Sequence, residues 1–210
     1  MNRKLSATET ALPVTTAEER VWDPWVRLFH WFLLITFCLA YWTQEEDYSL
    51  HLLAGYSVLG LVCFRIVWGI VGTRHARFAD FICRPPIVLA FLKGYVSGSA
   101  RRYAGHNPAG GYMILALLIC LLVITISGVM LDAAENRAGP LSGYRLFLYT
   151  DLIDEVHELS TSVCLGLISL HILGVLVSSW LCRENLVAAM ITGRKKIPTQ
   201  GKSDSKRDAT

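Results

Sequence analysis

The sequence lacks the cysteine patterns that hold most metal and redox centres. Its six cysteines form no CxxC or CxxCH pair, which argues against a zinc site, an iron–sulfur cluster and covalent c-type haem attachment. Most of them lie inside apolar runs, where a free cysteine acts as a small apolar filler. The N-terminal stretch also lacks an apolar core and a small-residue cleavage site, so no signal peptide is predicted.

Charge is scarce for a chain of 210 residues. Charged residues make up 18% and hydrophobic residues 53%, and the mean hydropathy is +0.41, which is typical of a membrane protein. Four apolar stretches, at about 24–42, 49–72, 109–131 and 154–181, are each long enough to cross a hydrocarbon core of about 30 Å. The sequence therefore predicts an all-α membrane protein, a four-transmembrane-helix bundle within a domain of residues 20–197.

Basic residues are nearly absent from one side of this bundle. Four spans place both termini and the connection 73–108 on one side, here called side A, and the connections 43–48 and 132–153 on the other, side B. Side B carries only Arg137 and Arg145, whereas the other Lys and Arg residues outside the spans lie on side A. The positive-inside rule makes side A cytoplasmic. We expect a multi-pass protein of the bacterial inner membrane with both termini in the cytoplasm.

The segments outside the spans differ in character. Residues 1–19 and 198–210 lack apolar periodicity, so we expect disordered cytoplasmic tails. The sequence PPIVLAFLKGYVSG, between the second and third spans, predicts a short interfacial helix on the cytoplasmic face. On side B the apolar sequence LFLY at Leu146–Tyr149 either dips into the membrane or docks a partner, and the sequence favours neither.

Histidine is missing from the third span and present in the other three. His157 and His171 in the fourth span are 14 residues apart, so they leave a helix within roughly 40° of each other and about 21 Å apart along its axis. An imidazole in hydrocarbon is costly unless it is paired or bound to a metal. The alternative is one core histidine bonded to a neighbouring helix and one hydrated histidine near the helix end.

The four histidines of the spans match in depth. His30 and His171 both lie toward the cytoplasmic side, and His51 and His157 both lie at the periplasmic side. Zinc or copper usually takes three or four ligands at one level, and a proton relay would include intramembrane carboxylates, which the middle of these spans lacks. A haem takes two axial imidazoles from opposite sides. We therefore predict two non-covalent haems, with His30/His171 and His51/His157 as iron ligands. A haem-free carrier or scaffold is the alternative, and an optical spectrum distinguishes it.

Two glycines and one arginine accompany the histidines. Gly55 and Gly174 share the histidine faces, where a missing side chain lets a porphyrin approach or, as the alternative, lets helices pack. Arg65 shares the face of His51 at the depth of the cytoplasmic pair. A buried cation needs a counter-ion, so we expect Arg65 to bind a haem propionate, with snorkelling to a lipid phosphate as the alternative. No catalytic side chain is predicted.

These stretches also resemble a known family. The motifs are WDPWVRLFHW, HLLAGY, FRIVWGIVGTRHARFADF, GHNPAGG and RENLVAAMITGRKK, together with the spacing of His157 and His171. As a set they are similar to the prokaryotic cytochrome b561 family, closest to its Ni/Fe-hydrogenase-type b-cytochrome branch, over about residues 20–196. The resemblance implies four helices that hold two non-covalent b haems through four histidines, here His30, His51, His157 and His171.

The resemblance also implies a function in electron transfer between membrane quinone and a redox partner. That partner is a hydrogenase or a periplasmic c-type cytochrome, and the short connection 132–153 makes a small c-type cytochrome at least as good an expectation. Quinone and membrane lipid are the other expected partners, and no nucleic acid is expected. Whether the chain is an electron-transfer subunit or an oxidoreductase component stays open. The alternative is an autonomous superoxide:quinone oxidoreductase that needs no protein partner. Arg74, His75 and Asp80 are candidates for a cytoplasmic quinone site.

Overall fold

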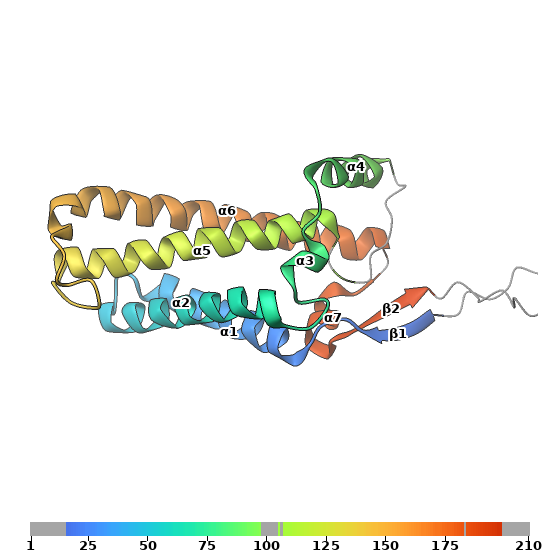
Figure 1. Cartoon of the computed structure of the whole chain (residues 1–210), viewed down its shortest axis with the longest axis horizontal. Helices are drawn as coiled ribbons and strands as arrows, with labels where there is room; N and C mark the ends of the chain where they lie inside the picture. The colour runs from blue at the N-terminus through green and yellow to red at the C-terminus, as the bar shows by residue number, and fades with distance from the viewer. Residues whose placement is uncertain (1–15, 98–104, 106, 183, 199–210) are drawn as a thin grey trace, which may run out of the picture.

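Long helices dominate the computed structural model, which describes residues 16–97, 105, 107–182 and 184–198 (Figure 1). The elements in chain order are β1 (Thr16–Arg20), α1 (Pro24–Thr43), α2 (Tyr48–Val71), α3 (Phe78–Phe81), α4 (Pro85–Val96), α5 (Pro108–Glu135), the 3₁₀ helix η1 (Leu146–Tyr149), α6 (Thr150–Cys182), α7 (Leu186–Thr192) and β2 (Arg194–Pro198). Helices α1, α2, α5 and α6 are long and apolar enough to cross a membrane. The prediction of a mostly helical protein with four membrane spans is confirmed.

Short polar side chains fix where three of the spans begin. Asp23 Oδ1 accepts a hydrogen bond from Val26 N at 2.9 Å, and Asp47 Oδ1 accepts one from Leu50 N at 3.0 Å. Asn107 caps α5 in the same way, with Gly110 N at 2.7 Å. Such caps satisfy amide groups that have no partner within the helix. The fourth span begins at Thr150, four residues before the predicted start, because the chain passes directly from η1 into α6.

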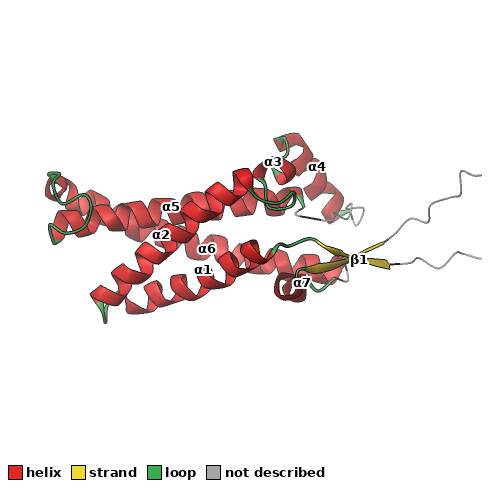
Figure 2. Ribbon diagram, turned by 60° about the horizontal axis from the view of Figure 1, so that its bottom comes forward, coloured by secondary structure: helices red, strands yellow, loops and turns green. Residues whose placement is uncertain are grey.

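The bundle is built from two helix pairs joined through α2 and α5. Helix α1 packs on α2, α5 packs on α6, and α2 crosses to contact α5 (Figure 2). A core cluster lies where they meet, formed by Phe29, Val58, Val62, Leu118, Cys120, Leu121 and Cys164. Among the described residues, α6 has no comparable packing contact with α1 or α2. Contacts between α6 and the first helix pair therefore depend on side chains, the histidines among them.

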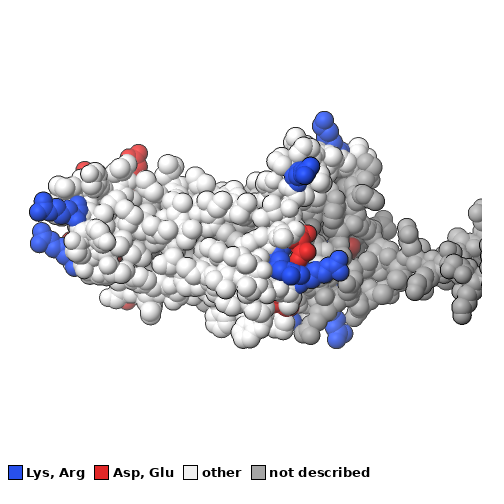
Figure 3. Space-filling model, in the orientation of Figure 1, with Lys and Arg blue, Asp and Glu red and all other residues white. Residues whose placement is uncertain are grey.

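The outer surface of the bundle is apolar. Trp42 and Trp180 are 78% and 80% exposed, and large aliphatic residues are exposed along all four long helices. On the face shown in Figure 3, Lys, Arg, Asp and Glu gather toward the two ends and leave the middle free of charge. A soluble protein would bury such a surface, so these helices contact lipid.

Both ends of the described chain leave from the same end of the bundle, beside α3, α4 and α7 (Figure 1). The α1–α2 and α5–α6 connections lie at the opposite end. This arrangement follows from an even number of spans. It places the segments assigned to side A together and those assigned to side B together.

One expectation about the tails is corrected. Thr16–Glu19 and Pro198 fall in the stretches expected to be disordered, yet Thr16–Arg20 pairs antiparallel with Arg194–Pro198. The register sets Glu18 opposite Lys196 and Glu19 opposite Lys195. The fold is thus helical with one added two-stranded sheet. The rest of both expected tails lies outside the described residues.

Candidate functional site

The side B pair of histidines, His51 and His157, is brought together by α2 and α6. The ring centres of His51 and His157 are 6.3 Å apart, and the ring planes make an angle of 73°. Matching the histidines by depth predicts this contact, although the two residues are far apart in sequence. The side B pair therefore consists of two facing imidazoles from separate helices.

Each ring of the side B pair is oriented by a backbone carbonyl behind it. His51 Nδ1 lies 2.8 Å from the carbonyl oxygen of Ala40 on α1, and His157 Nδ1 lies 3.0 Å from that of Ile124 on α5. A carbonyl oxygen can only accept, so in both rings Nδ1 carries the proton and donates it. In a neutral imidazole this leaves the Nε2 lone pair free, which is the form that binds a metal.

Helix α5 contributes more to His157 than the sequence suggests. Ser127 Oγ lies 3.1 Å from His157 Nδ1 and itself donates to the Ile124 carbonyl at 2.9 Å. A Cβ on Gly128 would lie 3.1 Å from His157 Cε1, so the ring packs directly against the helix backbone. Because this span has no histidine, the sequence predicts no part for it in ligation. The adjacent small residues Ser127 and Gly128 are the signal for the close approach.

The side A pair, His30 and His171, lies on α1 and α6. His171 lies near enough to His30 for the two rings to interact electrostatically. His30 Nδ1 is buried and has no hydrogen-bond partner among the described residues, and its ring meets Trp31 edge-on at 5.3 Å. The His30 ring therefore lacks the backbone carbonyl that holds Nδ1 of each side B ring. The structure thus brings the His51 and His157 rings into contact and places His171 within electrostatic range of His30.

The geometry fits two imidazoles that share one metal. Rings on opposite sides of an iron, each with a metal–nitrogen bond of about 2 Å, have centres roughly 6 Å apart, which is close to the His51–His157 separation. A Cβ on Gly55 or Gly174 would meet no atom within 4 Å, so both glycines lie beside open space. Neither glycine is therefore required for close packing between the helices of this chain.

Arg65 lies toward the side A end of α2 and is 2% exposed. Its Nη2 donates to the Ala76 carbonyl at 3.0 Å, and its guanidinium lies over the Phe78 ring, 5.0 Å from the ring centre. Nη1 is buried with no partner among the described residues. A buried guanidinium with a free donor matches the expectation of an anionic partner such as a carboxylate.

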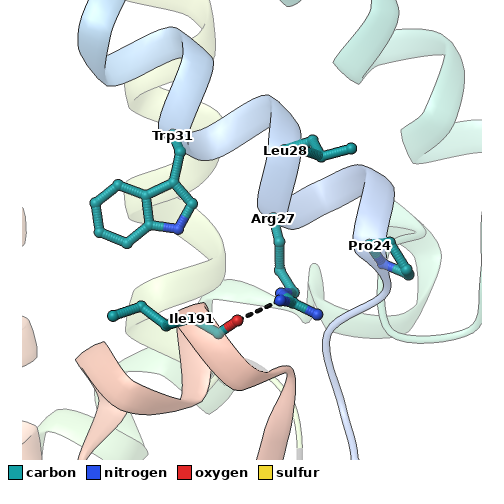
Figure 4. Close-up of a pocket in the computed structure, with 5 residues that line it drawn as sticks. All are labelled: Pro24, Arg27, Leu28, Trp31 and Ile191. Carbon is teal, nitrogen blue, oxygen red and sulfur yellow. Dashed lines mark hydrogen bonds between the residues drawn. The ribbon is translucent and has the colours of Figure 1, made fainter.

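A cavity of about 380 Å³ opens at the side A end of the bundle, between the start of α1 and α7. Figure 4 shows Trp31, Arg27 and Ile191 around it, with the Arg27 guanidinium bonded to the Ile191 carbonyl. Trp31 also contacts the His30 ring. The Trp31 side chain therefore lies between the His30 ring and any group in this cavity.

The other candidates lie apart from the histidine pairs. Asp80 forms an ion pair with Arg77 at 3.3 Å in the connection between α2 and α4. His75 lies in the same connection, whereas His106 is outside the described residues. In the part of the chain that the structure describes, no three His, Cys, Asp or Glu side chains come together as a site for a metal ion.

Comparison with known proteins agrees with this geometry. The family model described as prokaryotic cytochrome b561 matches residues 21–193, most of the chain. The chain belongs to the prokaryotic cytochrome b561 family. Among curated proteins, a probable Ni/Fe-hydrogenase B-type cytochrome subunit from Rhizobium leguminosarum bv. viciae is 24% identical over 163 residues, covering 70% of this chain and 67% of that protein. No solved structure matches the chain.

Membership in the cytochrome b561 family gives the chain its general role. It is a multi-pass bacterial membrane protein, a b-type cytochrome that binds haem b and transfers electrons. Haem supplies reversible one-electron oxidation and reduction of iron. The four histidines are the side chains whose chemistry and placement suit its axial ligation.

Proposed function

We propose that this cytochrome b561 holds two b haems, one between His51 and His157 and one between His30 and His171. The observation that supports this most is the side B pair, in which two rings face each other at 6.3 Å with both Nδ1 atoms donating to carbonyls. That arrangement directs two Nε2 lone pairs toward one position. The repeat of the pairing at a second depth, about 21 Å along α6, gives a path for electrons across the membrane.

The orientation follows from charge. Side A is cytoplasmic because it carries nearly all the basic residues outside the spans, and both termini then lie in the cytoplasm. Helix α4, which carries Lys93 in its last turn, lies on the cytoplasmic membrane interface in this arrangement. Arg65, on the same side, binds a propionate of the cytoplasmic haem through its unpartnered Nη1.

Quinone exchanges electrons at the cytoplasmic haem. The cavity beside Trp31 supports this placement because it opens at the outer edge of α1, where an apolar tail can remain in lipid. Trp31 lies between the cavity and His30. Arg74, His75 and Asp80 lie outside the residues that line this cavity.

The redox partner binds on the periplasmic side. Side B exposes acidic residues at the start of α6 and few basic ones, which favours encounter with a basic partner. The relative's name points to a hydrogenase, and a small c-type cytochrome is the other partner that fits. The described contacts do not favour the autonomous superoxide:quinone reaction over partner-based transfer.

Haem content in histidine variants tests this proposal. The purified wild-type chain is expected to hold two haems with the sharp α and Soret bands of reduced b haem. His51→Ala and His157→Ala are each expected to lose the same haem, and His30→Ala and His171→Ala the other. One haem per wild-type chain, or losses grouped in any other way, would contradict the proposal.

A further inference from the structure

The two histidine pairs differ in the hydrogen bonds behind their rings. On side B, both Nδ1–H groups donate to backbone carbonyls, those of Ala40 and Ile124. On side A, His30 Nδ1 is buried without an acceptor, and no hydrogen bond joins the His171 ring to any other described residue. The same ligand type is therefore placed in two different settings.

This difference acts on a bound iron through the ligand. An imidazole that donates Nδ1–H to a carbonyl gains electron density at Nε2 and becomes a stronger donor to the metal. Stronger donation stabilises the ferric state more than the ferrous state, so the reduction potential falls. Both ligands on side B have such a carbonyl, whereas the described residues provide neither ligand on side A with one.

A buried carboxylate at the side B end of the bundle acts in the same direction. Asp132 is 3% exposed, lies one helical turn beyond Gly128 on α5, and accepts a hydrogen bond from Tyr48 at 2.5 Å. Tyr48 is in turn three residues before His51. A buried carboxylate stabilises the ferric state of a nearby iron, because that state carries one more positive charge.

On side A the buried charge is positive. Arg65 is 2% exposed and lies on α2 at the depth of the side A pair, where a positive charge favours the more negative, ferrous state of a haem. Asp23 interacts electrostatically with Arg65 and offsets part of its charge. Asp23 is more exposed than Arg65, so water screens it more strongly and the buried cation dominates.

From these contacts we infer that the haem between His51 and His157 has the lower reduction potential of the two. The inference rests on the proposed function, which supplies the two haems. Ser127 and Gly128 are positioning residues in this account: both contact the His157 ring, and Ser127 also bonds the Ile124 carbonyl to which that ring donates. An electron that enters on side B then moves to the higher potential on side A, so the chain favours transfer from the periplasmic partner toward the cytoplasmic haem.

Potentiometric titration of single-haem variants tests the order directly. His30→Ala keeps the side B pair, and His51→Ala keeps the side A pair. The haem left in His30→Ala is expected to titrate at a lower potential than the haem left in His51→Ala. Equal potentials, or the reverse order, would overturn the inference while the haem counts of these variants still support the proposed function.

If the single-haem variants do not fold, a substitution in the two-haem protein tests the same inference. Asp132→Asn keeps an oxygen that accepts from Tyr48 and removes the buried charge. In the two-haem protein, the lower of the two potentials is expected to rise and the higher one to stay unchanged. Asp151→Asn, at an exposed position in the first turn of α6, is the matched control. It is expected to change neither reduction potential. A shift of the higher potential alone, or no shift, in Asp132→Asn would refute the assignment.

Discussion

On side B, both histidine rings rest against backbone carbonyls contributed by neighbouring helices, whereas on side A the His30 ring has an unpaired nitrogen and an aromatic neighbour. The side B pair is thus fixed by the fold of the chain alone. The side A end of the bundle also holds a cavity lined by Trp31, and a buried arginine, Arg65, whose Nη1 has no partner among the described residues. The difference shows that two sites with the same ligands can be given distinct properties by the residues behind them.

The largest effect is expected where the side B pair is held most closely. Gly128→Ala introduces a Cβ 3.1 Å from His157 Cε1, which forces the ring away from the Ile124 carbonyl. Loss of such a partner typically weakens metal-ligand binding about 10- to 100-fold. We expect the side B haem to bind more weakly by about this factor and the side A haem to be retained, as measured by haem transfer to an acceptor protein.

Gly166→Ala is the control for this comparison. Gly166 lies on α6, and a Cβ there meets no atom within 4 Å. Alanine also favours a helix by about 1 kcal/mol over glycine, so this variant is expected to keep both haems. Equal haem loss in the two variants would show that the contact between Gly128 and His157 does not matter for binding.

The corresponding test on side A replaces the buried cation. Arg65→Met keeps much of the side-chain volume and removes the donor to the Ala76 carbonyl, which costs about 1.5–3 kcal/mol if the hydrogen bond to a charged group is lost. We expect faster loss of the side A haem and an unchanged side B haem. Arg77→Met, at an exposed ion pair, is expected to change neither. Selective loss of the side B haem would mean that Arg65 serves the other site.

The sequence predicts the pairing of the histidines but not their surroundings. Helix rise and alternating span direction depend only on position in the chain, so His30, His51, His157 and His171 can be matched by depth from their residue numbers alone. The carbonyls of Ala40 and Ile124 cannot be found this way, because every residue has a carbonyl. Which carbonyl meets a ring depends on how α1, α5 and α6 are rotated against one another.

The pairing of β1 with β2, at the side A end of the bundle, also could not be predicted from local sequence. Thr16–Arg20 has no apolar alternation, and its partner Arg194–Pro198 lies at the other end of the chain. The two segments are brought together only because four spans return the chain to its starting side. Local sequence therefore predicts disorder, and the tertiary arrangement determines the pairing.

The hydrogen bond from Tyr48 to Asp132, at the side B end of the bundle, gives the next prediction. Tyr48→Phe removes the donor to buried Asp132 and leaves Asn136 Nδ2 at 3.5 Å as a weak replacement. A buried acceptor that loses its partner costs about 1–3 kcal/mol. We expect the free energy of unfolding in detergent to fall by this amount, whereas Tyr144→Phe, at an exposed position, is expected to have no effect. An unchanged stability in Tyr48→Phe would show that water replaces the phenol.

The smallest effect concerns Asp23, which links the start of α1 to the end of α2 on side A. Burial alone would raise the pKa of this carboxyl, but hydrogen bonds from Thr73, Val26 and Trp68 outweigh it and hold the pKa below the usual 3.8. A carboxyl with a lowered pKa in the folded state stabilises the protein above its ordinary pKa, and this contribution is lost as pH falls through the lowered value.

Asp23→Asn separates the charge of this side chain from its role as a helix cap. Asparagine still accepts the hydrogen bond from Val26 N, so the cap is retained, whereas Asp23→Ala loses about 1 kcal/mol. We expect the difference in stability between wild type and Asp23→Asn to shrink as the pH is lowered from 6 to below 3.8, measured by thermal unfolding in detergent. Because the side B haem lies at the far end of the bundle, its α band is expected to be unaffected by either variant. A change in that band would mean that the two ends of the bundle are coupled through the helices rather than tuned separately.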